Sequence, residues 1–239
     1  QGEVFGFSFV YSGNFLAQVE VDPYHVARAM LGINPHQFGW ELEPGAAFTA
    51  PEAVMVYSDA GLNGMSRTFH DLYRKHLISP KWSGKKRPIL INNWEATYFD
   101  FNEEKIMELA ADAKALGIEL FVLDDGWFGK RDNDASSLGN WTADPKKLPN
   151  GVEGLAEKIH SLGLQFGLWF EPEMVSVGTP IHEDHPDWKI GHPGKNISHG
   201  RNQYVLDFSR PEVVQNIFNQ MDAILDSKSI DYVKWDMNR

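Results

Sequence analysis

One construction occurs three times in this chain: the end of a helix, a small turn, a short apolar strand and then an acid. The first copy ends at Asp124 and Asp125, the second at Glu171 and the third at Asp236. Strands that alternate with amphipathic helices predict βαβ units and a parallel sheet. In a (β/α)-barrel the chemistry lies at the C-terminal ends of such strands, so we expect these acids to gather there. An open doubly wound sheet also binds ligands at strand ends, but no Gly-rich phosphate loop follows any of these strands.

The pattern predicts four strands after residue 88, which is half of an eight-stranded barrel. The expected strands begin near Ile89, Leu120, Phe166 and Tyr232. Asn102 is a candidate N-cap for the first intervening helix, and Ser209 with Glu212 predicts a capping box at the last one. Long loops over residues 126–150 and 171–201 exceed ordinary connections and are therefore expected to be functional.

The sequence of residues 1–58 predicts a structure different from that of the barrel part. Apolar and aromatic residues over 4–11, 15–21, 26–31 and 53–57 are typical of antiparallel strands with short turns. We therefore expect the C-terminal strands of a β-sandwich domain at 1–58, a helical linker at 59–88 and the first four βα units of an incomplete (β/α)8 TIM barrel at 89–239. Four strands do not close a sandwich, so the chain is expected to be an internal piece of a longer protein.

Composition excludes several classes of function. The net charge is −11, which disfavours binding to nucleic acid or to anionic membranes, because phosphate recognition needs clustered lysine and arginine. The chain contains no cysteine, so disulfides, thiolate metal ligands and thiol nucleophiles are absent. No apolar run approaches the roughly 18 residues that a bilayer span requires. The sequence indicates no cofactor.

The strand-end acids are the candidates for chemistry. Lys234 and Asp236 lie on one face of their strand because side chains alternate, so they form either a structural ion pair or part of an active site. Two carboxyl groups in opposite protonation states are the minimum for glycoside hydrolysis. Sugars also bind aromatic platforms. Candidates for these, or else for the core, are Trp94 and Trp169 near strand ends and Trp127 and Trp141 in the first long loop.

Two other interpretations are open. Adjacent Asp124 and Asp125 could hold a divalent cation, since hard cations take several oxygen ligands. No histidine or third acid lies at a spacing that completes such a site, so we expect no metal. A non-catalytic sugar-binding module would need the aromatic and acidic surface but no nucleophile, and the pair of Lys234 and Asp236 argues against it.

Four ordered motifs together resemble the α-galactosidases of glycoside hydrolase family 36. They are Asp124-Asp125-Gly126-Trp127, then Asn140-Trp141 with Asp144, Lys147, Pro149, Asn150 and Gly151, then Trp169-Phe170-Glu171-Pro172-Glu173-Met174, and finally Lys234-Trp235-Asp236-Met237-Asn238. The motifs are long, and the resemblance covers essentially the whole chain. It implies a retaining exo-α-galactosidase that acts on melibiose, raffinose and related sugars.

The resemblance also implies roles for single residues. Asp236 corresponds to the nucleophile, and Asp124 and Asp125 correspond to the acids that bind the hydroxyls distinguishing galactose from glucose. Other sugar-contacting positions correspond to Trp94, Trp169, Arg201 and Lys234. The general acid/base of the family lies on a later strand, beyond Arg239, and Glu171 and Glu173 are expected to be supporting residues.

Two related activities share this pattern: α-N-acetylgalactosaminidase, and the transfer of galactosyl groups to make raffinose-type sugars. The expected partner is an oligosaccharide substrate. The resemblance further implies a homo-oligomer, and we expect a cytoplasmic location.

Overall fold

The computed structural model describes residues 2–36, 38–192 and 194–238. The chain forms two compact units, residues 1–86 and residues 87–239. The terminal residues Gln1 and Arg239, which bound the predicted domain ranges, lie outside the described residues. The ranges themselves stay predictions.

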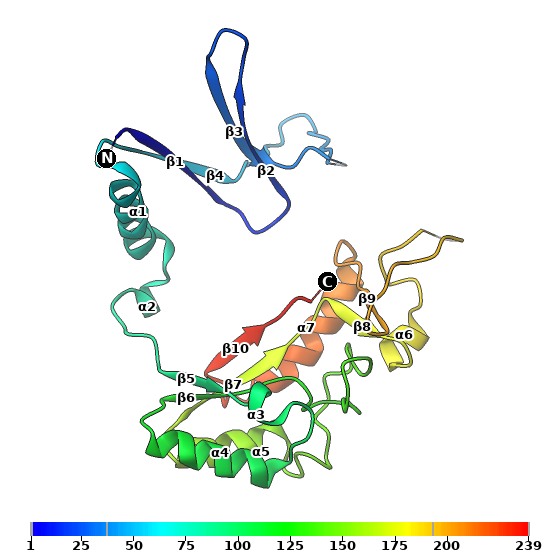
Figure 1. The fold of residues 1–239 in the computed structure, drawn as a ribbon. Coiled ribbons are helices and arrows are strands. Elements are labelled where there is room, and N and C mark those ends of the chain that lie inside the picture. Colours follow the sequence, from blue (N-terminus) through cyan, green and yellow to red (C-terminus); the bar gives the residue numbers. More distant parts are fainter. Residues whose placement is uncertain (1, 37, 193, 239) are drawn as a thin grey trace. The chain divides into compact units, whose positions relative to one another are not determined.

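The first unit is built from antiparallel strand pairs (Figure 1). Strand β1 (Val4–Val10) pairs with β4 (Glu52–Ser58), and β2 (Phe15–Val21) pairs with β3 (Ala27–Ile33). Helix α1 (Gly61–Leu72) packs against β1 so closely that a Cβ at Gly6 would lie 2.3 Å from Met65 Sδ. The predicted linker is thus helical at its start, and α1 continues into a π-helical turn, η1 (Tyr73–Leu77).

The linker contains a short helix that the sequence did not predict. Ser79 and Pro80 end the preceding helical segment, and Pro80 then begins α2 (Pro80–Ser83). Proline suits the first position of a helix because its missing N–H has no partner there in any case. The same residue that terminates one helix thus starts another.

The second unit carries a four-stranded parallel sheet in the order β5-β6-β7-β10. The strands are β5 (Leu90–Asn92), β6 (Leu120–Leu123), β7 (Gln165–Phe170) and β10 (Tyr232–Trp235). Helices α4 (Glu103–Ala115), α5 (Gly151–Ser161) and α7 (Pro211–Leu225) form the crossovers. This order confirms the predicted fold class, the first four βα units of a (β/α)8 barrel preceded by antiparallel strands.

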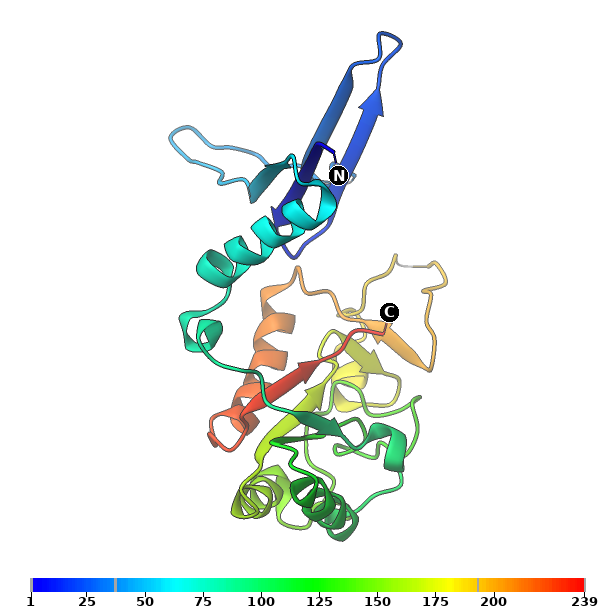
Figure 2. The ribbon, with the colours of Figure 1, turned by 60° about the vertical axis from the view of Figure 1, so that its left-hand side comes forward.

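The second unit also contains smaller elements between its strands and crossover helices. Helix α3 (Trp94–Thr97) follows β5, and helix α6 (Pro180–Asp184) follows β7. Strand β8 (Met174–Ser176) pairs antiparallel with β9 (Gln203–Val205), within the long connection between β7 and α7. Figure 2 shows α4 and α5 side by side on one face of the sheet, and α7 beside β10.

The repeated construction has a common backbone geometry. A residue two or three positions after the end of each crossover helix takes a left-handed conformation: Gly117 at φ 83°, Gly163 at φ 76° and Lys228 at φ 57°. Glycine adopts this conformation without steric cost, which is why it commonly ends helices. Lys228 shows that the third copy keeps the turn even without glycine.

Helix starts follow the local prediction in one case and depart from it in another. The Asn102 side chain caps α4 by accepting from the Lys105 backbone N–H at 2.9 Å. The predicted capping box at α7 is wrong: Arg210 is the N-cap residue, and no side chain caps the helix. The Ser209 hydroxyl donates to Asp207 instead, and Glu212 accepts from Arg210.

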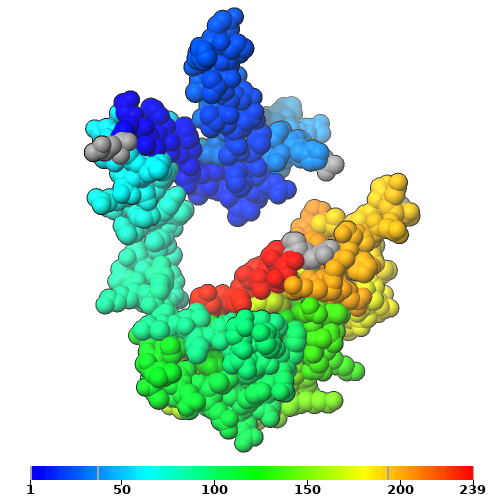
Figure 3. Space-filling view, in the orientation of Figure 1, coloured from blue at the N-terminus to red at the C-terminus, as the bar shows by residue number. Residues whose placement is uncertain are grey.

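The core lies beneath the inner strands. All four residues of β6 are buried, as are Phe166 to Phe170 of β7. The edge strand β10 is more open, with Tyr232 at 43% and Trp235 at 55% exposure, and Figure 3 shows it (red) at the surface of its unit. Within the described ranges, no helix has both the length and the apolar character needed to cross a membrane.

Candidate active site

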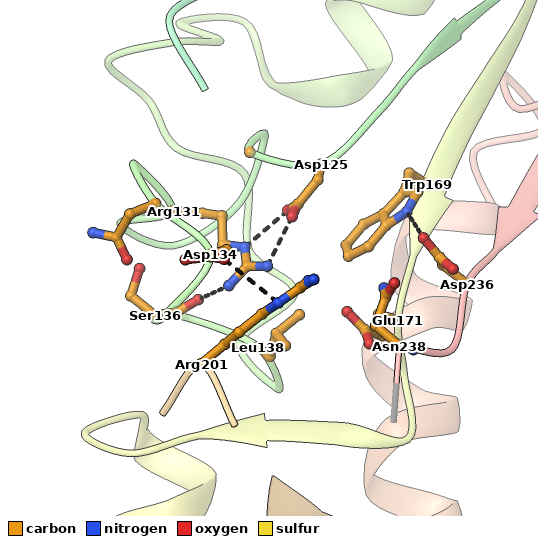
Figure 4. Close-up of polar contacts among 12 residues, drawn as sticks. Asp125, Arg131, Asp134, Ser136, Leu138, Trp169, Glu171, Arg201, Asp236 and Asn238 are labelled. Carbon is orange, nitrogen blue, oxygen red and sulfur yellow. Dashed lines mark hydrogen bonds and ion pairs between the residues drawn. The ribbon is translucent and has the colours of Figure 1, made fainter. Parts of the chain in front are cut away.

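The predicted acids gather at the carboxyl edge of the parallel sheet. Asp125 follows β6, Glu171 follows β7 and Asp236 follows β10. In the close-up of Figure 4, the Arg201 side chain extends into the space among these carboxyl groups. The sheet topology therefore brings together residues more than 100 positions apart, as the strand-end pattern predicted.

Asp236 is held by neutral donors. The indole Nε1 of Trp169 donates to Asp236 Oδ2 at 3.0 Å, and the Met237 backbone N–H donates to Oδ1 at 2.9 Å. Burial alone would raise the pKa of Asp236. The hydrogen bonds from Trp169, Met237 and Asn238, with the charge of Lys234, outweigh it and hold the pKa below its ordinary value. Asp236 is thus kept ionised.

Lys234 has a different direct partner from the one suggested by the sequence. Its Nζ lies 2.7 Å from Asp124 Oδ2, so the ion pair joins β10 to the end of β6 rather than to Asp236. Asn92 also donates to Asp124 Oδ2, and the Asp124 backbone N–H donates to Asn93 at 2.8 Å. The end of the first strand therefore fixes the acid that follows the second.

Asp125 is paired with a second cation. Arg131 donates from Nε to Oδ1 at 2.9 Å and from Nη2 to Oδ2 at 2.7 Å. Burial raises the pKa of Asp125, and Arg131 opposes this with its hydrogen bonds and charge, whereas neighbouring Asp124 adds to the rise. Because Asp124 and Asp125 each have a protein cation, a bound metal is not needed to neutralise them. Among the residues that the structure describes, no group of three or more His, Cys, Asp or Glu side chains could hold a metal ion.

Glu171 and Glu173 are engaged by the chain that follows the last strand. Glu171 is 1% exposed, and its Oε1 accepts from the Asn238 backbone N–H at 2.9 Å. Burial raises the pKa of Glu171, with hydrogen bonds from Asn238 acting in the opposite sense. Glu173 accepts from Trp235 Nε1 at 3.0 and 3.1 Å. Both glutamates thus hold β10 and its extension in place.

The first long loop is a packed structure. The ammonium of Lys147, only 8% exposed, donates to the carbonyls of Phe99, Gly126 and Arg131 at 2.9–3.0 Å. Trp127 and Trp141 are 0% and 3% exposed and pack in the core with Phe128 and Trp169, with their rings tilted or edge to face. These two indoles are therefore core residues.

The other predicted contact residues lie around the same edge. Trp94 begins α3 directly after β5 and meets Tyr98 and Phe99 edge to face, at 5.2 and 5.0 Å between ring centroids. Trp169 is 2% exposed. Arg201 has a left-handed backbone at φ 52° and lies 3.5 Å from Asp134. A non-glycine residue held at positive φ is uncommon and costs conformational energy.

Two residues of this site, Arg131 and Asn92, were missed from the sequence, as were the backbone carbonyls that accept from Lys147. Arg131 lies six positions after Asp125 in an irregular loop. The only available signal was that a buried acid needs a cation, and Arg131 was one of several within reach along the loop.

Comparisons with known proteins agree over the whole chain. The melibiase family model matches residues 47–239, and the model of the glycosyl hydrolase family 36 N-terminal domain matches residues 1–43. The chain is 60% identical over 239 residues to the α-galactosidase AgaA of Geobacillus stearothermophilus. It is 52% identical over 238 residues to the α-galactosidase Mel36A of Lactobacillus acidophilus. In both comparisons the match covers 100% of this chain.

The structural comparison gives the same result. The crystal structure of AgaA superposes with a TM-score of 0.95 and covers 100% of this chain. A variant of AgaA was crystallised in complex with raffinose, and another in complex with stachyose. The chain spans about a third of the length of these relatives, 33% of AgaA and 32% of Mel36A.

Proposed function

The chain belongs to glycoside hydrolase family 36, the melibiases, and from that membership we propose that the full-length protein is a retaining α-galactosidase. It removes terminal α-galactosyl residues from oligosaccharides of the melibiose and raffinose type. Complexes of AgaA variants with raffinose and stachyose support this substrate class. Homo-oligomeric assembly and a cytoplasmic location belong to the same proposal, and light scattering and cell fractionation test them.

Asp236 is the proposed nucleophile, and its hydrogen bonding carries the proposal. Its carboxylate lies at the end of β10, accepts from Trp169 and Met237, and has a lowered pKa. An ionised carboxylate can attack the anomeric carbon and form a covalent glycosyl-enzyme while the leaving oxygen takes a proton from a second carboxyl group. Water then cleaves the ester, which restores Asp236 and retains the anomeric configuration. We assign the acid/base role to no residue of this chain.

Asp124 and Asp125 are the proposed acceptors of sugar hydroxyls. A carboxylate oxygen has two lone pairs, so an acid already bound to a lysine or arginine can still accept from a hydroxyl. A sugar epimer that places its hydroxyl elsewhere leaves these buried acceptors unpaired, which costs binding energy. Trp94, Trp169, Arg201 and Lys234 complete the proposed contact set through the family resemblance.

The test is chemical labelling of the full-length protein with a mechanism-based galactosyl inhibitor, followed by peptide mass spectrometry. The label should lie on Asp236. Substitution Asp236→Asn should lower turnover of an aryl α-galactoside by on the order of 10⁴-fold or more, with unfolding unchanged. The exposed Asp226, at the end of α7, provides a matched control, because Asp226→Asn should keep full activity. Near-normal turnover of the Asp236 variant would remove the nucleophile assignment.

A further inference from the structure

Arg131 is a buried charge outside the residues given a role above. Its side chain is 2% exposed, and it lies in the loop between β6 and α5. Removing a guanidinium from water is costly unless its donors are satisfied. Here Nε and Nη2 donate to Asp125, and Nη1 donates to the Ser136 carbonyl (Figure 4). Because burying this charge costs desolvation energy, we look for its role in the acid that it binds, Asp125.

The pair of hydrogen bonds from the Arg131 guanidinium, which acts as a two-pronged fork, fixes the plane of the Asp125 carboxylate. Two parallel N–H···O bonds from one rigid guanidinium allow a carboxylate little rotation, unlike a single bond from an ammonium. On the other side, the Asp125 backbone N–H donates to Asp124 Oδ1 at 2.8 Å. Asp125 is therefore fixed at both its main chain and its side chain.

Arg131 is itself held by a second buried cation. The ammonium of Lys147 donates to the carbonyl of Gly126, next to Asp125, and to the carbonyl of Arg131. The guanidinium also lies over two aromatic rings, 5.7 Å from the Phe99 centroid and 5.9 Å from the Phe128 centroid. These contacts set the path of the turn, so the distance between acid and arginine is built into the loop.

We propose that Arg131 is a positioning residue that presents Asp125 to the sugar as an oriented hydroxyl acceptor and so sets the selectivity of the site for the galactosyl configuration. The inference rests on the proposed function. It assigns Arg131 no contact with the reacting atoms. Its effect passes through Asp125, whose remaining lone pairs face away from the guanidinium fork.

The charges around Asp125 predict a pH signature. Arg131 is the cation that faces it directly, Asp124 is the adjacent anion, and Lys234 pairs with Asp124. Burial and Asp124 already raise the pKa of Asp125, with Arg131 opposing them. Loss of Arg131 would raise this pKa further, and the protonated carboxyl would then offer a donor where the sugar needs an acceptor. Activity of such a variant is therefore lost as pH falls, through a range where the wild type is still active.

The experiment is a double-mutant cycle in the full-length protein. Arg131→Met, Asp125→Asn and the double variant are compared in kcat and KM for an aryl α-galactoside across pH, with Tm measured for each. Arg131→Met should lower kcat/KM by roughly 10- to 100-fold, mainly through KM, in line with the loss of one charged hydrogen bond to the ligand. In the Asp125→Asn background the same substitution should cost little, since its target is gone.

Two further variants separate positioning from scaffolding. Arg131→Lys keeps the charge but loses the fork, so KM should rise while the pH profile stays like that of the wild type. Arg210, which pairs with Asp187 and Glu212 at the start of α7, is the matched control, and Arg210→Met should leave KM and the pH profile unchanged.

Equal losses from Arg131→Met at every pH, and in both backgrounds, would show that Arg131 only holds the loop and would overturn the inference. If that variant does not fold, Arg131→Lys decides: a raised KM at unchanged Tm supports the inference, and a wild-type KM overturns it. A wild-type protein without activity on α-galactosides would instead refute the proposed function, and the inference would fall with it.

Discussion

Trp169→Phe tests how the proposed nucleophile is kept ionised. Trp169 is the penultimate residue of β7, beside β10, and its buried Nε1 donates to Asp236 Oδ2 at 3.0 Å. Phenylalanine keeps an aromatic ring in the cluster but removes this donor. A hydrogen bond to a charged group contributes about 1.5–3 kcal/mol, and one pKa unit corresponds to about 1.36 kcal/mol. Loss of the bond should therefore raise the pKa of Asp236, because the charged form loses a donor that stabilises it.

The direction in which the pKa of Asp236 changes determines how kcat/KM of the variant depends on pH. The pKa of Asp236 is lowered in the folded protein, with Trp169 the largest of the lowering causes. Raising it reduces the ionised fraction at a given acid pH, so the acid limb of kcat/KM should move to higher pH. At a pH on that limb, the variant should be about 10- to 100-fold slower than the wild type. At higher pH, where both forms are ionised, the difference should shrink.

The assay is kcat/KM for an aryl α-galactoside against pH in the full-length protein. Trp141→Phe is the matched control, because Trp141 lies in the same aromatic cluster and its buried Nε1 has no hydrogen-bond partner among the described residues. Both variants open a similar void and should lose similar stability. Only Trp169→Phe should move the acid limb. Acid limbs that coincide for both variants and the wild type would refute the reasoning.

The same geometry supports three other predictions. Glu171→Gln should keep kcat within about tenfold of the wild type, since it changes one hydrogen bond to Asn238; a loss as large as that of Asp236→Asn would make Glu171 the acid. Burial raises the pKa of Glu171, so ionising this carboxyl costs the folded protein stability. As pH rises above the ordinary glutamate range, the Tm of Glu171→Gln should therefore increase relative to the Tm of the wild type. Residues 1–239 produced alone should bind an apolar dye and hydrolyse no aryl α-galactoside, because β5 and β10 are open sheet edges and Phe218 and Trp235 are 56% and 55% exposed. Cooperative unfolding together with measurable hydrolysis would contradict this last expectation.

The fold was predictable because its signals are local. The alternation of apolar helices and strands, the left-handed glycines at 117 and 163 and the Asn102 cap each depend on a few neighbouring residues. The capping box at α7 failed for a tertiary reason. The Arg210 guanidinium reaches Asp187, 23 residues earlier, and this contact sets the start of the helix. Such a contact leaves no trace in the sequence around Ser209 and Glu212.

The site was predictable only as a set of acids. Strand ends give the positions of Asp125, Glu171 and Asp236, because topology alone brings them together. Their partners depend on the path of irregular loops and on side-chain reach. Lys234 reaches past the intervening strand β7 to Asp124, although Asp236 lies two residues away. Arg131 folds back on Asp125 only because Lys147 fixes the loop.

The distribution of charge around the acids matches what each must do in the proposed reaction. In the proposed roles, Asp124 and Asp125 accept hydroxyls and form no covalent bond, so a direct cation, Lys234 or Arg131, stabilises their negative charge without opposing any step. Asp236 must lose its charge when it forms the ester. A direct ion pair would stabilise its ground state and be weakened on the way to the intermediate, which would slow the attack. Within the described part of the chain no lysine or arginine nitrogen lies within 4.0 Å of Asp236, and its carboxylate accepts from neutral donors of Trp169, Met237 and Asn238. Introducing a cation next to Asp236 should therefore lower its pKa yet reduce kcat, whereas the loss of a neutral donor should act mainly through the pKa.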